Sequence, residues 1–275
     1  MRLLALTALV MVAFAANSLL NRAAVGGGLI DALPFALLRV LAGAVVLAML
    51  ARAWPTRRAI LPGIWLATYL LGFSLAYVAL DAGIGALILF AGVQVTMLAG
   101  ALFSSEAVPP RRMIGAGIAL AGLAGLMVPG AGAVPGVVPA LLMAMAAFGW
   151  GLYSLAGRGA QTPLRDTAAN FLVASPIIAL AALPAPWAGT QPAGVALALV
   201  AGAITSGLGY ALWYRILPRL GASRAAVAQL CVPVIALAAG ALLLGETLTG
   251  WALGASGVVL AGVALAQFPT RPRTP

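Results

Sequence analysis

Long, uninterrupted apolar runs separated by short polar breaks dominate this sequence and limit what it can fold into. Of its 275 residues, 64% are hydrophobic and only 7% are charged, whereas about a quarter of the residues in a soluble domain are charged. Because a bilayer offers backbone groups no hydrogen-bond partner, chains that cross it do so as helices or closed barrels. The runs lack the polar–apolar alternation of barrel strands. We therefore predict an all-α membrane protein.

The runs are long enough for ten transmembrane helices, since about 20 apolar residues cross a bilayer. The predicted spans cover residues 3–20, 33–51, 60–80, 83–103, 113–129, 136–156, 167–183, 194–217, 224–244 and 250–268. Turn-forming and charged residues separate them, as at Gly26-Gly27-Gly28 and Pro109-Pro110-Arg111-Arg112. The connections are short, so we expect no soluble domain.

The charge distribution predicts how the chain is oriented. The net charge is +10, and all 15 basic residues are arginines scattered between the apolar runs, so no basic domain is available for nucleic acid. With the N-terminus in the cytoplasm, 13 arginines lie on the inner side, Arg22 lies outside and Arg39 lies within the second span. This asymmetry predicts a multi-pass inner (plasma) membrane protein whose N- and C-termini are both cytoplasmic.

An internal repeat predicts two related halves. Residues 99–106 (AGALFSSE) match 239–246 (AGALLLGE), and 117–122 (GIALAG) match 257–262 (GVVLAG), both at an offset of 140 residues. Five spans in each half is an odd number, so the halves must insert with opposite topology. We expect one five-helix repeat over residues 1–130, an inverted one over 135–269, and a cytoplasmic tail over 270–275. Inverted repeats are typical of secondary transporters.

Several short motifs resemble those of the drug/metabolite transporter superfamily, in its ten-helix form with two EamA-type repeats. They include residues 16–22 (ANSLLNR), Phe35 and Arg39 with Gly43-Ala44, residues 148–154 (FGWGLYS), Pro233 and residues 244–247 (LGET). In the first half, Val93 stands where Pro233 would by the repeat, and Ser-Ser-Glu replaces Leu-Gly-Glu. The resemblance implies an exporter of metabolites or amino acids with a central cavity. Within the superfamily the chain is most similar to amino acid exporters, including YddG-type exporters of aromatic amino acids.

Aromatic and amide side chains within the spans are the candidate substrate-binding groups. Trp65, Tyr69, Phe73 and Tyr77 recur every four residues, which places them on one helix face. Aromatic faces suit planar substrates and ammonium groups. The full candidate set is Asn17, Tyr69, Phe73, Tyr77, Phe90, Gln94, Trp150, Tyr210, Trp213, Tyr214 and Gln229. The alternatives are an interfacial aromatic belt or core packing for the rings and bridges between helices for the amides.

A second group of positions concerns movement and charge. Pro233 crowds the carbonyl group of Gln229 and predicts a kink in the ninth span, and with Gly207 and Gly209 it is a candidate hinge or gate. A purely structural kink is the alternative. Arg39 either attracts a substrate carboxylate or extends outward to the interface. Glu106 and Glu246 are interpreted as anions near helix N-termini.

The residue types that are missing limit the mechanism. The chain has no His and no Lys, and its five acids lie in loops or at span ends, so we expect no enzyme activity, no metal and no cofactor. Without an acid deep in the membrane, we expect facilitated diffusion or exchange of a neutral or zwitterionic solute. The expected partners are a small-molecule substrate and the lipid bilayer, around a monomer. Export of drugs or lipid-like amphiphiles is the alternative.

Overall fold

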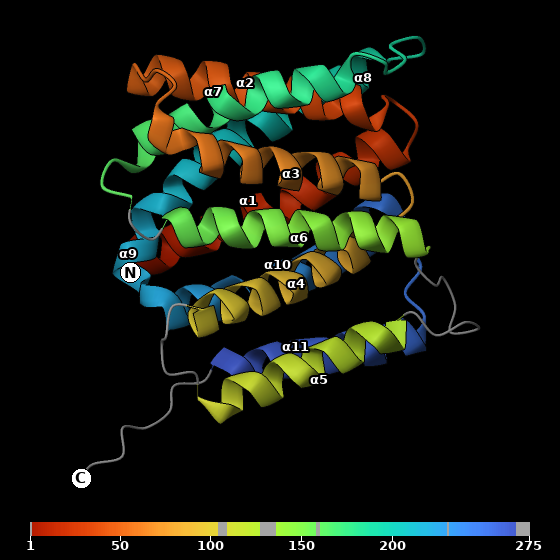
Figure 1. Cartoon of the computed structure of the whole chain (residues 1–275). Helices are drawn as coiled ribbons and strands as arrows, with labels where there is room; N and C mark the ends of the chain where they lie inside the picture. The colour runs from red at the N-terminus through yellow and green to blue at the C-terminus, as the bar shows by residue number, and fades with distance from the viewer. Residues whose placement is uncertain (1, 104–108, 127–135, 158–159, 230, 268–275) are drawn as a thin grey trace.

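Helices make up all the regular secondary structure of the described chain (Figure 1). The computed structural model describes residues 2–103, 109–126, 136–157, 160–229 and 231–267. In the first half, the elements are α1 (Arg2–Asn21), η1 (Arg22–Gly26), α2 (Ala32–Ala51), η2 (Arg57–Ala59), α3 (Ile60–Ala76), α4 (Ala82–Phe103) and α5 (Pro110–Leu126). In the second half, they are α6 (Val137–Gly157), α7 (Pro163–Ala182), α8 (Pro192–Val200), η3 (Ala201–Leu208), α9 (Gly209–Gln229), α10 (Cys231–Leu244) and α11 (Gly250–Gln267).

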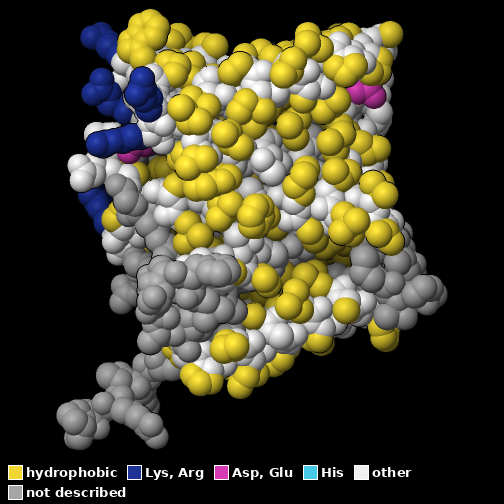
Figure 2. Space-filling model, viewed as in Figure 1, with side chains coloured by type: hydrophobic (Ala, Val, Ile, Leu, Met, Phe, Trp, Pro, Cys, Tyr) yellow, Lys and Arg dark blue, Asp and Glu magenta, His cyan; other side chains and the backbone are white. Residues whose placement is uncertain are grey.

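The helices confirm the all-α membrane architecture with ten spans. Within the described residues, six helical stretches are long and apolar enough to cross a membrane, and four shorter apolar helices accompany them. The shorter ones are Ala82–Met97, Met113–Gly125, Cys231–Leu244 and Gly250–Leu265. Hydrophobic side chains cover most of the face shown in Figure 2, while the arginines of that face gather at one end of the bundle. This surface is suited to lipid rather than water.

Two predicted span boundaries were wrong for reasons of local backbone chemistry. The third span was expected to reach residue 80, but α3 ends at Ala76 and the chain turns before Asp81. The seventh was expected from residue 167, but α7 begins at Pro163. Proline is favoured at the first helical position because its missing N–H would be unpaired there. The predicted half boundaries at 130 and 135, the tail at 270–275 and Glu106 lie outside the described residues.

The eighth span also differs from the prediction. The eighth combines α8, the π-helical segment η3 and the first part of α9, rather than one regular α-helix. The predicted ninth span covers the end of α9 and all of α10, with residue 230 between them outside the described residues. The kink expected at Pro233 therefore stays a prediction.

The two halves pack against each other as inverted repeats. Helix α2 packs against α7, α4 against α10, and α5 against α11, so each pair joins equivalent spans of the two halves. The contact of α3 with α6 has its counterpart in the contacts of α1 with η3 and α9. Helices α5 and α11 run antiparallel, and α1 begins at the end of the bundle where α11 ends (Figure 1).

The pair formed by α5 and α11 shows the symmetry at single residues. A Cβ atom on Gly122 would lie 2.8 Å from the backbone nitrogen of Val259, and one on Gly262 would collide with the backbone nitrogen of Ala119. Gly122 and Gly262 are equivalent in the sequence repeat, as are Ala119 and Val259. Small residues let helix backbones approach closely in membranes, where dispersion contacts replace the hydrophobic effect. The glycine that recurs in both halves therefore allows α5 and α11 to pack closely.

Replacing either glycine with alanine tests this packing. Gly122→Ala and Gly262→Ala should each lower the free energy of unfolding by about 1–3 kcal/mol, as overpacking usually does. Gly117→Ala and Gly257→Ala are matched controls from the same motifs, because nothing lies within 4 Å of a Cβ atom at either position. The free energy of unfolding of all four variants is measured by titration with a denaturing detergent. Equal effects in tight and open positions would contradict the packing role.

Candidate functional site

A buried arginine stands at the centre of the molecule. Arg39, on α2, is fully buried, with 0% of its surface exposed. Its Nε donates a hydrogen bond to Ser206 Oγ at 2.8 Å, and its Nη2 donates to the hydroxyl groups of Tyr210 at 2.9 Å and Tyr69 at 3.3 Å. The guanidinium also lies over the rings of Phe73 and Tyr69, 4.9 and 5.6 Å from their centroids. The outward-extending alternative for Arg39 was therefore wrong.

The positive charge of Arg39 is incompletely satisfied. Its Nη1 is buried without a hydrogen-bond partner in the described part of the chain. The ion pairs found among the described residues all belong to Arg22, so no described carboxylate neutralises Arg39. A buried guanidinium carries a large desolvation cost unless it is paired or hydrogen-bonded. Neutral hydroxyls and ring faces compensate only part of that cost, which leaves the site attractive to an anionic group.

The π-helical segment η3 supplies much of the polar network around Arg39. Asn17 Oδ1 accepts hydrogen bonds from Thr205 Oγ1 at 2.6 Å and from Ser206 Oγ at 3.1 Å. A bulge of this kind changes the helical register locally and occurs often at functional sites. Here, two adjacent hydroxyls reach the same amide oxygen. Helix α2 approaches η3 closely at Gly202, because glycine has no side chain. A Cβ atom at this position would collide with the carbonyl oxygen of Arg39.

Aromatic rings from both halves enclose the centre. The Trp150 ring centroid lies 4.7 Å from that of Tyr210 and 5.0 Å from that of Tyr69, and Phe14 meets Trp150 edge-on at 5.6 Å. These rings line a void of about 10 Å³, which is close to the minimum for one water molecule. Its complete lining is Phe14, Asn17, Tyr69, Phe73, Leu89, Phe90, Trp150 and Tyr210. A solute can occupy this centre only when the rings separate.

Six of the predicted binding residues thus line one void: Asn17, Tyr69, Phe73, Phe90, Trp150 and Tyr210. Three other predicted aromatic residues lie next to this group. Trp213 packs edge-on against Phe14 at 5.6 Å, and the Tyr77 ring meets Phe73 at 4.7 Å. Tyr214 stacks on Tyr153 at 5.1 Å, and the Tyr153 ring in turn lies 5.5 Å from that of Trp150.

The remaining predicted positions do not line the void. Gln94 lies one turn beyond Phe90 on α4, and Gln229 is buried at the end of α9. Gly207 belongs to η3, where an added Cβ atom would lie 3.3 Å from the Cα atom of Gly43. Gly209 begins α9, and Pro233 lies on α10. The roles proposed for these positions in binding or hinge motion stay predictions.

Sequence reasoning missed Phe14, Leu89, Thr205 and Ser206. Phe14 and Leu89 look like any other apolar residue of a span, so no pattern distinguishes them. The two hydroxyl residues stand between Gly202 and Gly207 in an apolar run, and that cluster was a usable signal. The π-helical geometry that directs them to Asn17 depends on tertiary packing. Among the described residues, no group of three His, Cys, Asp or Glu side chains is placed to hold a metal ion.

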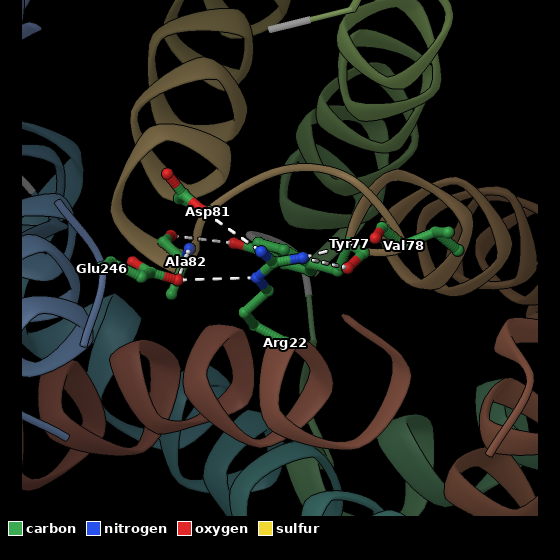
Figure 3. Close-up of polar contacts among 6 residues, drawn as sticks. All are labelled: Arg22, Tyr77, Val78, Asp81, Ala82 and Glu246. Atoms are coloured by element: carbon green, nitrogen blue, oxygen red, sulfur yellow. Dashed lines mark hydrogen bonds and ion pairs between the residues drawn. The ribbon is translucent and has the colours of Figure 1, made fainter. Parts of the chain in front are cut away.

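At the end of the bundle opposite the gathered arginines, Arg22 joins three connections (Figure 3). Its Nη2 lies 3.3 Å from Asp81 Oδ1, and its Nε lies 3.7 Å from Glu246 Oε1. Its Nη1 donates hydrogen bonds to the backbone oxygens of Val78 at 3.3 Å and Tyr77 at 3.5 Å. The contacts hold the end of α1, the α3–α4 connection and the α10–α11 connection together.

Glu246 also caps a helix of the other half. Its Oε1 accepts a hydrogen bond of 2.7 Å from the backbone N–H of Ala82, the first residue of α4. The expected position at a helix N-terminus is confirmed, but the helix is α4 rather than the next one along the chain. Desolvation by burial raises the pKa of Glu246, against the opposing effects of the Ala82 N–H and Arg22. The carboxylate is thus held in a position where burial favours protonation.

This shift predicts a pH dependence of stability. A raised pKa means that the folded protein binds this proton more tightly than the unfolded chain does. The contribution of Glu246 is then greatest below the unfolded pKa, and the free energy of unfolding falls as the pH rises through the folded pKa. Glu246→Gln should flatten this slope in unfolding measurements made at increasing pH above the ordinary carboxyl pKa. An unchanged slope in the variant would contradict the assignment to Glu246.

Comparison with known proteins supports a transporter. Residues 138–268 match the EamA-like transporter family. An uncharacterised protein of Pseudomonas aeruginosa is 46% identical over 98% of this chain and 95% of its own length. A probable amino-acid metabolite efflux pump of Salmonella typhimurium is 44% identical, over 24% of this chain and 22% of its own length. An uncharacterised transporter of Archaeoglobus fulgidus is 26% identical over 69% of each chain.

A solved crystal structure shares the fold with a TM-score of 0.64 and 19% sequence identity, and the match covers 95% of both chains. At that identity the likeness concerns the fold alone. The ten-span inverted architecture, the match over the second repeat and the transporter relatives agree with one another. Residues 138–268 thus form an EamA-like transporter family domain.

Proposed function

We propose that this transporter exports small zwitterionic metabolites, namely amino acids and among them aromatic ones, through the central site. The observation that carries the proposal is Arg39, which is wholly buried and hydrogen-bonded only to neutral partners, with Nη1 unpaired in the described structure. A carboxylate would complete its hydrogen bonding and neutralise its charge. Buried charged residues in membrane spans usually mark a solute pathway.

The surroundings of Arg39 favour a zwitterion over a cation. Asp31, Asp81, Asp166 and Glu246, the described acids, all lie in connections or in a first helical turn. A cationic solute would therefore meet the charge of Arg39 without a carboxylate to offset it. Amino acids bring one carboxylate to the guanidinium and one ammonium to the aromatic faces, where cation–π attraction operates. The name of the Salmonella relative agrees with this class of solute.

The aromatic lining favours solutes with planar side chains. Tyr69, Trp150 and Tyr210 present rings from both halves to one void, and offset or edge contacts between rings each add about 0.5–1.5 kcal/mol beyond burial. Transport would proceed by alternating access, since the void is too small for a solute and the two inverted halves can exchange conformations. Gly207, Gly209 and Pro233 are the proposed hinge positions.

The gathering of arginines at one end supports an orientation. We place that end in the cytoplasm, with both chain termini, and the cluster around Arg22 on the outer side of the inner membrane. A single chain contains both halves, so a monomer suffices. Uptake driven by the solute gradient alone, or by exchange, requires no titratable acid in the core.

Arg39 variants test the nature of the solute. Arg39→Gln should reduce the uptake of L-tryptophan into proteoliposomes by at least about tenfold, because a hydrogen bond to a charged group contributes about 1.5–3 kcal/mol. Arg39→Lys keeps the charge without the planar fork and should restore part of the rate. Arg2→Gln, at an exposed position, is the control. If Arg39→Gln spared amino acids, or reduced the transport of neutral lipophilic drugs equally, the amphiphile alternative would be favoured.

Trp150 tests the aromatic specificity. Trp150→Ala should raise the half-saturation concentration for L-tryptophan by about threefold to tenfold, the equivalent of one lost ring contact. The value for L-alanine, which has no ring, should change less than about twofold. Phe148→Ala is the matched control, since Phe148 lies on the same helix and is 55% exposed. Equal changes for both amino acids would remove Trp150 from the substrate contacts.

A further inference from the structure

A larger cavity opens at the arginine-rich end, away from the central void. It has a volume of about 370 Å³ and lies where η2, α3, α6, α7 and α9 meet. Its polar lining includes Arg58, Gln161, Thr162, Asp166, Asn170 and Tyr214. Cavities that bind small molecules usually fall between about 300 and 1,000 Å³. This one is large enough for an amino acid, whereas the central void is not.

Two opposite charges line this cavity without neutralising each other. Arg58 and Asp166 both line its wall, yet no ion pair joins them. Asp166 is held in the first turn of α7, where its carboxylate accepts hydrogen bonds from the backbone N–H of Thr162 at 3.2 Å and from Thr162 Oγ1 at 3.0 Å. A carboxylate has about four acceptor positions, so Asp166 retains capacity for a ligand.

The floor of the cavity leads toward the central site. Tyr214 lines the cavity, is 1% exposed and donates a hydrogen bond of 2.9 Å to the backbone oxygen of Tyr153. The Tyr153 ring in turn lies 5.5 Å from Trp150, which lines the central void. Gly157 leaves room for the Tyr214 ring, since an added Cβ atom would collide with that ring. A stack of three rings thus separates the cavity from the centre.

We propose that this cavity is a second solute site, at which a zwitterionic amino acid is captured before it enters the central site. The solute carboxylate binds Arg58, and the ammonium group binds Asp166. This proposal rests on the proposed function and adds a binding step to it. The separated charges provide selectivity for zwitterions at the surface, and the aromatic stack is the barrier that the solute crosses next.

Neutralising each charge tests the site in proteoliposomes. Arg58→Gln and Asp166→Asn should each raise the half-saturation concentration for L-tryptophan by about threefold to tenfold, as expected for one partly solvated charged contact. Arg57→Gln and Arg165→Gln are matched controls, because these neighbouring arginines do not line the cavity. Both controls should stay within about twofold of the unmodified protein.

Solute derivatives separate binding from a loss of folding, since Asp166 also caps α7. Tryptophan amide lacks the carboxylate, and N-acetyltryptophan lacks the ammonium group. As inhibitors of L-tryptophan uptake, both should be weaker than tryptophan itself. Arg58→Gln should reduce the preference for tryptophan over tryptophan amide and leave the preference over N-acetyltryptophan unchanged. Asp166→Asn should reduce the preference for tryptophan over N-acetyltryptophan and leave the preference over the amide unchanged. A merely misfolded variant would alter both alike.

The outcomes distinguish this inference from the proposed function. If the unmodified protein transports no amino acid, the proposed function fails. If it transports tryptophan, but Arg58→Gln and Asp166→Asn behave like Arg57→Gln and Arg165→Gln, the capture site is wrong while the function stands. Derivative-specific changes in both variants would support the site.

Discussion

Holding one guanidinium group inside an apolar bundle is the constraint on which the central structure depends. Arg39 is supplied with two tyrosine hydroxyls, a serine hydroxyl and two ring faces, which come from α3, η3 and α9. Because the bilayer core provides no water to complete its shell, each of these groups has to be placed by the fold. The π-helical turn, the glycine contacts of α2 and the aromatic stripe of α3 all serve this placement.

The inverted halves divide the molecule into two ends with different chemistry. Around Arg22, charged groups from three connections meet and hold the helices together. At the arginine-rich end, Arg58 and Asp166 face one cavity without pairing. The charged groups at one end therefore pair with one another, whereas Arg58 and Asp166 at the other end form no ion pair with each other.

Glycine contributes to both packing and the site. At Gly122 and Gly262, the missing side chain brings α5 and α11 together outside the centre, and at Gly202 it lets η3 approach the backbone of Arg39. At these positions, backbone atoms of the neighbouring helices come close to each other. The central rings, by comparison, enclose a small void and meet mostly at tilted or edge-on angles. The side chains that must move for a solute to pass are thus supported by helices that are closely packed elsewhere.

The amino-acid sequence by itself determined the membrane architecture. Span length, the arginine distribution and the repeat at 140 residues are local or periodic properties, so ten helices and their inversion could be predicted from them. The aromatic candidates on α3 were found for the same reason, since spacing of four residues places Tyr69, Phe73 and Tyr77 on one face. Helix ends were predicted less well where proline or a turn decided them.

Only the tertiary structure decided which candidates share a site. Whether Arg39 turns inward depends on Ser206 and Tyr210, which are 167 and 171 residues away along the chain. The π-helical register of η3, the helix that Glu246 caps and the separation of Arg58 from Asp166 likewise depend on contacts between distant segments. Such contacts leave no periodic signal in a chain rich in Ala, Leu and Gly, because many apolar pairings have similar energies. Polar groups inside the membrane distinguish the correct helix pairing from the others only once the helices have packed and these groups can form hydrogen bonds.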